Sequence, residues 1–427
     1  MKQQKLTFAS LSQYSLLALP LAFAGVPLYI LAPDFYATHY GINLSSLGIA
    51  LLCIRLFDAI QDPFIGIMGD RYRDRRLITM GVAAIMLVCS IYSLFNLYFM
   101  STMIWFTLCM VCAVTAYSVL TINLNTTGAL WMTQKKLQTQ ISSMREGFGL
   151  LGLVIAVSMP TFLEKIVSRN TVYQWFCLVF MMLTLIGFIG FCLWYRMNFQ
   201  EDHNKKSISW INSFRSFSLS SKTFFLIYFM STFASSIPAV LVIFFVRDLL
   251  DAEIYTGFFL LVYFISAICF IPIWNFASQK QGKYKCWFLS MLLASLSFIW
   301  AFWLTKGDVW QYSLICLVSG SALGADLVFP PSIIADHIHT LKKQETASTH
   351  YGVLVLLTKA ALAFASGLSF FMLDYADFTP GGKNSVVSLS RLSIAYALIP
   401  CIIKIGTALL LWHSLIKPQK GNFYETT

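Results

Sequence analysis

The chain has 427 residues, of which 58% are hydrophobic, 16% are aromatic and only 11% are charged. An average soluble domain carries about 25% charged residues, and a soluble fold of this length could not hide so much apolar surface. The composition therefore excludes an ordinary soluble enzyme, a disordered chain and a nucleic-acid-binding protein. It indicates an integral membrane protein with many helices.

Apolar runs of about 20 residues, long enough to cross a membrane, recur along the whole chain. Because only helices or a closed barrel satisfy backbone polar groups in lipid, these runs predict helices. Twelve spans are expected, at 12–36, 44–68, 77–99, 103–131, 142–163, 171–195, 222–246, 255–277, 285–305, 310–334, 350–373 and 389–414. The first is too long for a cleaved signal peptide, so we expect it to remain as a span.

The longest polar stretch follows the sixth span and divides the chain into two groups of six. We therefore expect an N-terminal half at 1–197, a cytoplasmic linker at 198–221 and a C-terminal half at 222–427. Aromatic and aliphatic residues at 210–214 suggest a short amphipathic helix at the membrane surface within the linker.

The net charge of +11 is explained by where the positive residues lie. Of the 30 Lys and Arg residues, 20 lie on the side of the two termini, 6 on the opposite side and 4 within spans. Because positive residues gather in cytoplasmic loops, both termini are expected in the cytoplasm. The charge is therefore a topological signal, and no nucleic-acid partner is implied.

The second span carries charged residues that share one face of the predicted helix. At about 100° per residue, Asp62 lies about 40° from Asp58 and about 20° from Arg55. Two close carboxylates repel unless a proton or a cation lies between them. Pro63 also frees the carbonyl of Ala59, and hard cations take oxygen ligands. The pattern predicts a coupling site for H⁺ or Na⁺; the alternative is a structural Arg–Asp pair.

The eleventh span contains Lys359, about eight residues or 12 Å from its cytoplasmic end. Asp58 lies at a similar depth of about 15 Å in its own span, so the two side chains could meet across the halves. Lys359 would then be a mobile counter-charge or a substrate ligand, and a static salt bridge is the alternative. Asp326 and Lys404 lie within the tenth and twelfth spans.

Other polar residues are candidates for a substrate cavity. Arg145 and Glu146 open the fifth span; because consecutive helical residues point about 100° apart, Arg145 could face a central cavity while Glu146 faces a loop. Asn123 and Asn125 lie in the fourth span, with Trp131 beyond them. Polar contacts between helices are the alternative role for the two asparagines.

A basic loop follows the second span. Its residues of interest are Gly66, Asp70, Arg71 and Arg75. The loop resembles the G-x-x-x-D-R-x-G-R-R-R loop of the major facilitator superfamily, with Arg73 in place of a glycine. An acid and a basic cluster at a helix end can pair with a neighbouring helix in one conformation only. The equivalent loop at 274–285 has no acid, but the two related loops suggest the parallel repeat of this superfamily.

Within the superfamily, R-L-F-D-A-I-Q-D-P at 55–63 resembles the motif R-x-W-D-A-x-N-D-P of the glycoside–pentoside–hexuronide:cation symporters, the melibiose permease type. The resemblance implies twelve transmembrane helices in two halves, the major facilitator fold. It implies a cation site at Asp58, Asp62 and Gln61, where Gln61 takes the place of an Asn.

The resemblance also implies that Arg145 and Lys359 lie near the substrate cavity. The sugar-binding members carry one acid in helix one and another in helix four, whereas this chain has none in helix one and has Asn123 and Asn125 in helix four. A sugar clamped by paired carboxylates is therefore not implied. The substrate could be a different sugar, or a less polar or anionic molecule.

These observations favour a cation-coupled symporter of a small solute, a sugar or glycoside, in which two halves rock around a midplane site. A lipid or lysolipid translocase on the same fold is the alternative, favoured by the apolar first helix. A membrane-embedded enzyme is a remote alternative, for which His337 and His339 near Asp336 are the candidates. No cofactor beyond the coupling ion is implied. We expect a monomer in the inner membrane of a bacterium, with the solute and the bilayer as its partners.

Overall fold

The computed structural model describes residues 6–97, 99, 101–163, 169–199, 219–382 and 384–417. These residues are almost entirely helical and contain no strand, as apolar runs must be when lipid cannot satisfy their backbone. The all-α fold expected from the sequence is confirmed. The expected amphipathic helix at 210–214, and most of the expected linker around it, lie outside the described residues.

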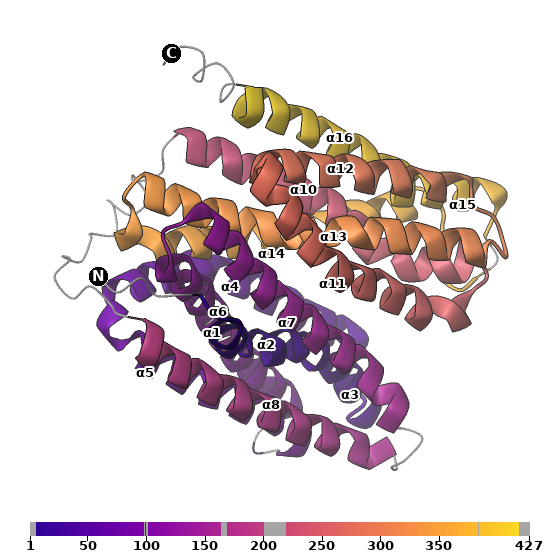
Figure 1. Cartoon of the computed structure of the whole chain (residues 1–427). Helices are drawn as coiled ribbons and strands as arrows, with labels where there is room; N and C mark the ends of the chain where they lie inside the picture. The colour runs from indigo at the N-terminus through magenta and orange to yellow at the C-terminus, as the bar shows by residue number, and fades with distance from the viewer. Residues whose placement is uncertain are drawn as a thin grey trace. The chain divides into compact units, whose positions relative to one another are not determined.

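The described residues group into two compact units, of which the first contains residues up to 216 together with 334–356. In its N-terminal segment α5 packs along α6, α2 along α7 and α4 along α6. The helices of this segment are α1 (Phe8–Ser15), α2 (Ala18–Val26), α3 (Ala32–His39), α4 (Leu44–Arg71), α5 (Arg76–Asn96), α6 (Thr102–Trp131), α7 (Lys135–Leu163) and α8 (Arg169–Asn198) (Figure 1). The first expected span is thus divided among α1, α2 and α3, with a π-helical turn at Pro27–Leu31.

The second unit contains residues 217–333 and 357–427. Both α10 and α12 pack along α16. The helices of this part of the chain are α10 (Leu219–Phe244), α11 (Thr256–Gln281), α12 (Lys283–Phe298), α13 (Val309–Thr340), α14 (Ala347–Asp374), α15 (Val386–Ser393) and α16 (Ile399–Leu411) (Figure 1). The last turns of α13 and the first turns of α14 belong to the first unit.

Eleven helical segments among the described residues are long and apolar enough to cross a membrane. The remaining expected span corresponds to α4, a helix of 28 residues that continues through Pro63. Several helices extend beyond the expected spans, and two do so by well over a turn: α7 begins at Lys135 rather than at 142, and α13 continues to Thr340 rather than ending at 334. Counting apolar residues detects only the part of a helix that suits hydrocarbon, so polar helix ends are missed.

Candidate coupling and substrate site

Two acidic side chains one turn apart on α4 are buried. Asp58 is 2% exposed and Asp62 is 0% exposed, whereas Arg55 on the same helix is exposed. Residues at i and i+4 share a helix face, so the burial of both acids agrees with their spacing. Removing a carboxylate from water is costly unless it is paired or hydrogen-bonded, and this makes the surroundings of the two acids informative.

Hydroxyl groups of α6 lie beside this acidic face. Ser118 Oγ donates a hydrogen bond to Asp58 Oδ1 at 3.2 Å, and Gln61 Nε2 donates to the same oxygen at 3.1 Å. Thr115 Oγ1 donates to Gln61 Oε1 at 2.9 Å. Thr115 and Ser118 are three residues apart, so they lie on one face of the helix that packs along α4. Carboxylate, amide and hydroxyl oxygens are the groups that hard cations bind.

Asp62 lies where α4 meets the first turns of α14. The backbones approach so closely that a Cβ added to Gly352 would lie 2.6 Å from the carbonyl oxygen of Asp62 and 3.3 Å from Cα of Pro63. Such an approach requires a residue without a side chain at this position. Within the first unit, the start of α14 therefore lies against the backbone of α4 at Asp62.

Asp70 joins the end of α4 to the start of α14. Its carboxylate accepts hydrogen bonds from the backbone N–H of Ser348 at 2.8 Å and from the N–H and hydroxyl of Thr349 at 2.8 and 2.6 Å. The first N–H groups of a helix have no intrahelical acceptor and carry partial positive charge, so a carboxylate is a favourable cap. Gly66 belongs to the same contact, because a Cβ there would lie 2.6 Å from the carbonyl oxygen of Ser348.

The arginines of this loop differ in their surroundings. Arg71 and Arg75, the two predicted to act in the loop, are exposed. Arg76 at the start of α5 is 2% exposed and donates to the carbonyl of Gly69 and the hydroxyl of Ser348, each at 3.4 Å. The structure therefore identifies Arg76 as the basic residue beside the Asp70 cap, which the sequence analysis did not select.

The equivalent loop of the second unit has its own buried cation. Gly282 adopts a φ of 83° between α11 and α12, a conformation that favours glycine. Lys283 then opens α12, is 8% exposed and donates to the carbonyl oxygen of Ser332 at 3.2 Å. In both loops, a cation at the first position of a helix donates to a backbone carbonyl.

Arg145 pairs with its own neighbour. Its side chain is 5% exposed, and its Nη2 lies 2.5 Å from Oε1 of Glu146. This differs from the expectation that the two residues face different surroundings. Consecutive Cβ atoms do point apart, but both side chains are long enough to fold back toward each other. The pair compensates a buried charge that would be costly alone. A role for Arg145 at a substrate cavity stays a prediction.

The fourth-span candidates are engaged within the first unit. Asn123 and Asn125 each donate through the side-chain amide to the carbonyl four residues earlier, at 2.8 Å. Trp131 is 7% exposed, and its ring centroid lies 5.8 Å from that of Tyr14 and 4.7 Å from that of Trp194. These are the contacts of packed interior positions. Their predicted place at a substrate cavity stays a prediction.

Lys359 lies on the part of α14 that belongs to the second unit, and its side chain is partly buried. The neighbouring Thr358 shares a hydrogen bond of 2.7 Å with the hydroxyl of Tyr228 in α10. That Lys359 meets Asp58 stays a prediction.

One charged pair was not predicted as a pair. Lys404 of α16 is paired with Asp326 of α13, 78 residues earlier. The sequence places both charges within spans, but two residues so far apart along the chain give no sign that their side chains meet. The α6 hydroxyls at Thr115 and Ser118 were also missed, although their helical spacing was a signal.

One of the candidate residues for an enzyme, His339, contacts backbone. A ring nitrogen of His339 lies 2.6 Å from the carbonyl oxygen of Ala129, so this imidazole is engaged by backbone. Among the described residues, no group of three His, Cys, Asp or Glu could hold a metal ion. Na⁺ binds oxygen ligands, and the carboxylates of Asp58 and Asp62 and the hydroxyl of Ser118 are groups of this kind.

Comparison with known proteins identifies the family to which this chain is matched and the solved structures that share its fold. A family model described as MFS/sugar transport protein matches residues 13–416. No curated protein matches the chain.

Similar solved structures include the fucose:proton symporter of E. coli, with 13% identity over 95% of this chain and 98% of that chain and a TM-score of 0.68. The proton:xylose symporter bound to 6-bromo-6-deoxy-D-glucose has 12% identity over 96% and 95%, with a TM-score of 0.69. A bacterial homologue of the iron transporter ferroportin in the outward-facing state has 14% identity over 93% and 99%, with a TM-score of 0.69. At these identities the likeness shows the fold alone.

Proposed function

Because the chain belongs to the family described as MFS/sugar transport protein, within the major facilitator superfamily, we propose that it is a secondary transporter that couples H⁺ or Na⁺ to the movement of a small solute. Proteins of this superfamily are transporters rather than enzymes. The observation that carries the coupling is the burial of Asp58 and Asp62 one turn apart on α4. Burying two like charges so close together is unfavourable unless a cation shares the site.

Coupling follows because the two buried carboxylates are unfavourable when no cation is bound between them. With a proton or Na⁺ bound, the repulsion between Asp58 and Asp62 is reduced, and the loaded site can be enclosed. Without the cation, the carboxylates need water, which favours a conformation open to one side. Gln61 and Ser118 donate hydrogen bonds to Asp58 through the amide nitrogen and the hydroxyl, and Thr115 donates to the amide oxygen of Gln61. Cation occupancy is thereby linked to conformation, as alternating access requires.

The solute we propose is a sugar or glycoside. The family description supports a sugar, and the resemblance of residues 55–63 to the melibiose permease type supports coupling to a cation. We assign the solute site to the side chains predicted for it. These are Arg145, Lys359, Asn123, Asn125 and Trp131.

Conformational change would break the contact between Asp70 and the start of α14. The hydrogen bonds of this contact all end on the single carboxylate of Asp70, so a small shift of α4 along α14 removes them together. Gly66, Arg71 and Arg75 belong to the same loop.

The chain is an integral membrane protein with many spans. We propose that it acts as a monomer in the inner membrane of a bacterium, with both termini in the cytoplasm. The excess of Lys and Arg on the side of the termini supports this orientation.

Transport by Asp58→Asn tests the coupling. Purified protein in liposomes would be given a panel of radiolabelled monosaccharides and disaccharides, with an inward Na⁺ gradient, an inward proton gradient, or neither. We expect gradient-driven accumulation of at least one sugar by the natural protein. In Asp58→Asn the accumulation should fall at least tenfold, because one of the two carboxylates that hold the cation is neutral. Asp74→Asn, which changes an exposed acid of the loop, is the matched control.

Accumulation by Asp58→Asn equal to that of the control would refute the coupling role. A protein that moves none of the sugars but flips a fluorescent lysolipid across the bilayer would be a translocase, and the sugar assignment would fail.

A further inference from the structure

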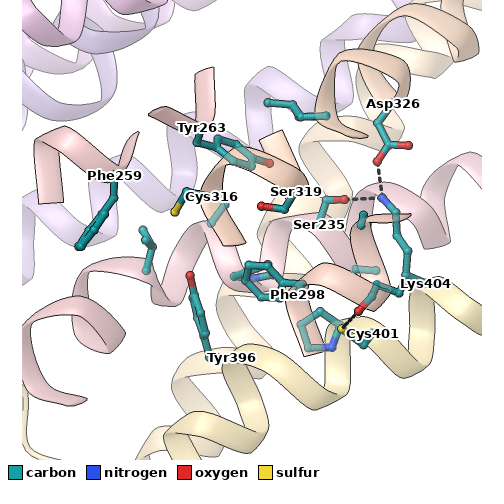
Figure 2. Close-up of a pocket in the computed structure, with 18 of the residues that line it drawn as sticks. Ser235, Phe259, Tyr263, Phe298, Cys316, Ser319, Asp326, Tyr396, Cys401 and Lys404 are labelled. Atoms are coloured by element: carbon teal, nitrogen blue, oxygen red, sulfur yellow. Dashed lines mark hydrogen bonds and ion pairs between the residues drawn. The ribbon is translucent and has the colours of Figure 1, made fainter. Parts of the chain in front are cut away.

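A cavity of about 470 Å³ lies within the second unit, between α10, α11, α12, α13 and α16 (Figure 2). Its size is that of a site for a drug-sized molecule. None of the residues predicted for cation coupling or for the solute lines it. The cavity is therefore considered as a separate binding site, and the side chains that line it indicate which class of molecule could bind there.

One end of the cavity is aromatic. The hydroxyls of Tyr312 and Tyr396 lie 2.6 Å apart, so one donates a hydrogen bond to the other. The ring of Phe259 packs edge-on against Tyr312 at 4.7 Å, and that of Phe298 lies 5.1 Å from Tyr396. Rings held by other rings form a rigid wall. An apolar body, aromatic or aliphatic, is what such a wall contacts favourably.

The other end carries the charged pair. The ammonium of Lys404 donates to Asp326 Oδ2 and to Ser235 Oγ at 2.6 Å (Figure 2). It also donates to the carbonyl oxygen of Ser231 at 3.4 Å. Asp326 Oδ1 accepts a hydrogen bond from Trp287 Nε1 at 3.1 Å. Lys404 is 5% exposed. An ammonium has three N–H donors, and all three are used here.

These contacts determine what a ligand can offer. Because Lys404 and Asp326 neutralise each other, a ligand with a net charge would bring an uncompensated charge into a largely apolar cavity, which is unfavourable. The ammonium has no donor left, whereas a carboxylate can accept about four hydrogen bonds and Asp326 accepts two. Asp326 can therefore accept further hydrogen bonds, and a ligand hydroxyl can donate one.

We propose that this cavity is a binding site for an uncharged, largely apolar molecule with a hydroxyl group, such as a phenol or a long-chain alcohol. The hydroxyl donates to Asp326, and the apolar body lies along the aromatic wall formed by Phe259, Phe298, Tyr312 and Tyr396. The site is separate from the residues proposed for cation coupling, so it stands whether or not coupling at Asp58 is correct.

Photolabelling of the full-length protein in detergent tests the site. The probe is a phenol that carries a trifluoromethyl diazirine, and labelled residues are located by mass spectrometry of peptides. The competitors are 2-naphthol, naphthalene and naphthalene-2-carboxylate, each titrated over the same range of concentrations in the detergent phase. We expect the label on residues that line the cavity. Protection by 2-naphthol should require at least tenfold lower concentration than protection by either of the other two.

A filled cavity provides the matched variant. Ala239→Trp places a large side chain on the lining of the cavity and should reduce the protected labelling at least fivefold. Leu226→Trp changes a residue of the same helix that is 54% exposed and does not line the cavity, and it should label like the natural protein.

Two results would overturn the proposal. Label confined to exposed residues outside the cavity, with no protection by 2-naphthol, would show that the cavity binds no such molecule. Equal or stronger protection by the carboxylate or by naphthalene would show that the assigned ligand class is wrong. The competitor series uses the natural protein, so it decides the question even if Ala239→Trp does not fold.

Discussion

Replacing Gly352 with alanine tests the close approach of α14 to α4. In a helix interior, alanine is more favourable than glycine by about 0.5–1 kcal/mol. At Gly352, however, the new Cβ would lie 2.6 Å from the carbonyl oxygen of Asp62, a backbone atom that cannot rotate away. Overpacking of this kind costs about 1–3 kcal/mol. We therefore expect a net loss of stability of up to about 2.5 kcal/mol.

Gly147 of α7 is the matched control, because a Cβ there would meet nothing within 4 Å. Gly147→Ala should gain about 0.5–1 kcal/mol, so the two variants should shift in opposite directions. Five of the ten cysteines are buried, so unfolding in detergent can be followed with a thiol-reactive dye. A change of 1 kcal/mol moves Tm by about 2–4 °C in domains of 150–250 residues. Equal stabilisation by both alanines would refute the close contact.

Two further substitutions test the other contacts by the same measurement. Asp70→Ala should lower Tm, because three donors at the start of α14 lose their acceptor at a cost of about 1–3 kcal/mol. Asp74→Ala, at an exposed position, should lower Tm by less. Equal Tm values for the two variants would show that the cap contributes nothing. Lys404→Met leaves the partly buried Asp326 without its counter-ion and should cost up to about 3–5 kcal/mol. The double change Lys404→Met with Asp326→Leu should regain most of that loss, and a double variant no more stable than the single one would contradict the pairing.

Much of the helical fold could be predicted because its causes are local. An apolar run longer than the membrane is thick must form a helix, whatever lies beside it. The shared burial of Asp58 and Asp62 could be predicted for a similar reason, since i and i+4 residues of any α-helix share a face. The helix ends were less predictable: α7 begins at Lys135, in polar sequence that does not resemble a membrane span.

The partners of the charged groups could not be predicted. Consecutive positions suggested that Arg145 and Glu146 would separate, but the length and flexibility of their side chains let them pair. Among the loop arginines, composition did not distinguish Arg76, which is buried, from Arg71 and Arg75, which are exposed. Side-chain conformation and burial depend on neighbours that helical periodicity does not specify.

The sequence by itself determined a membrane-embedded helical protein, the positions of most spans and the acidic face of α4. Each of these follows from the composition or spacing of residues within one segment. Only the tertiary structure decided that Asp70 caps a helix beginning nearly 280 residues later, and that Lys404 meets Asp326 at one end of a cavity in the second unit. A hydrogen bond or an ion pair requires two helices to be placed within a few ångströms of each other. That placement depends on many small packing contacts distributed along both helices, and no single segment contains them.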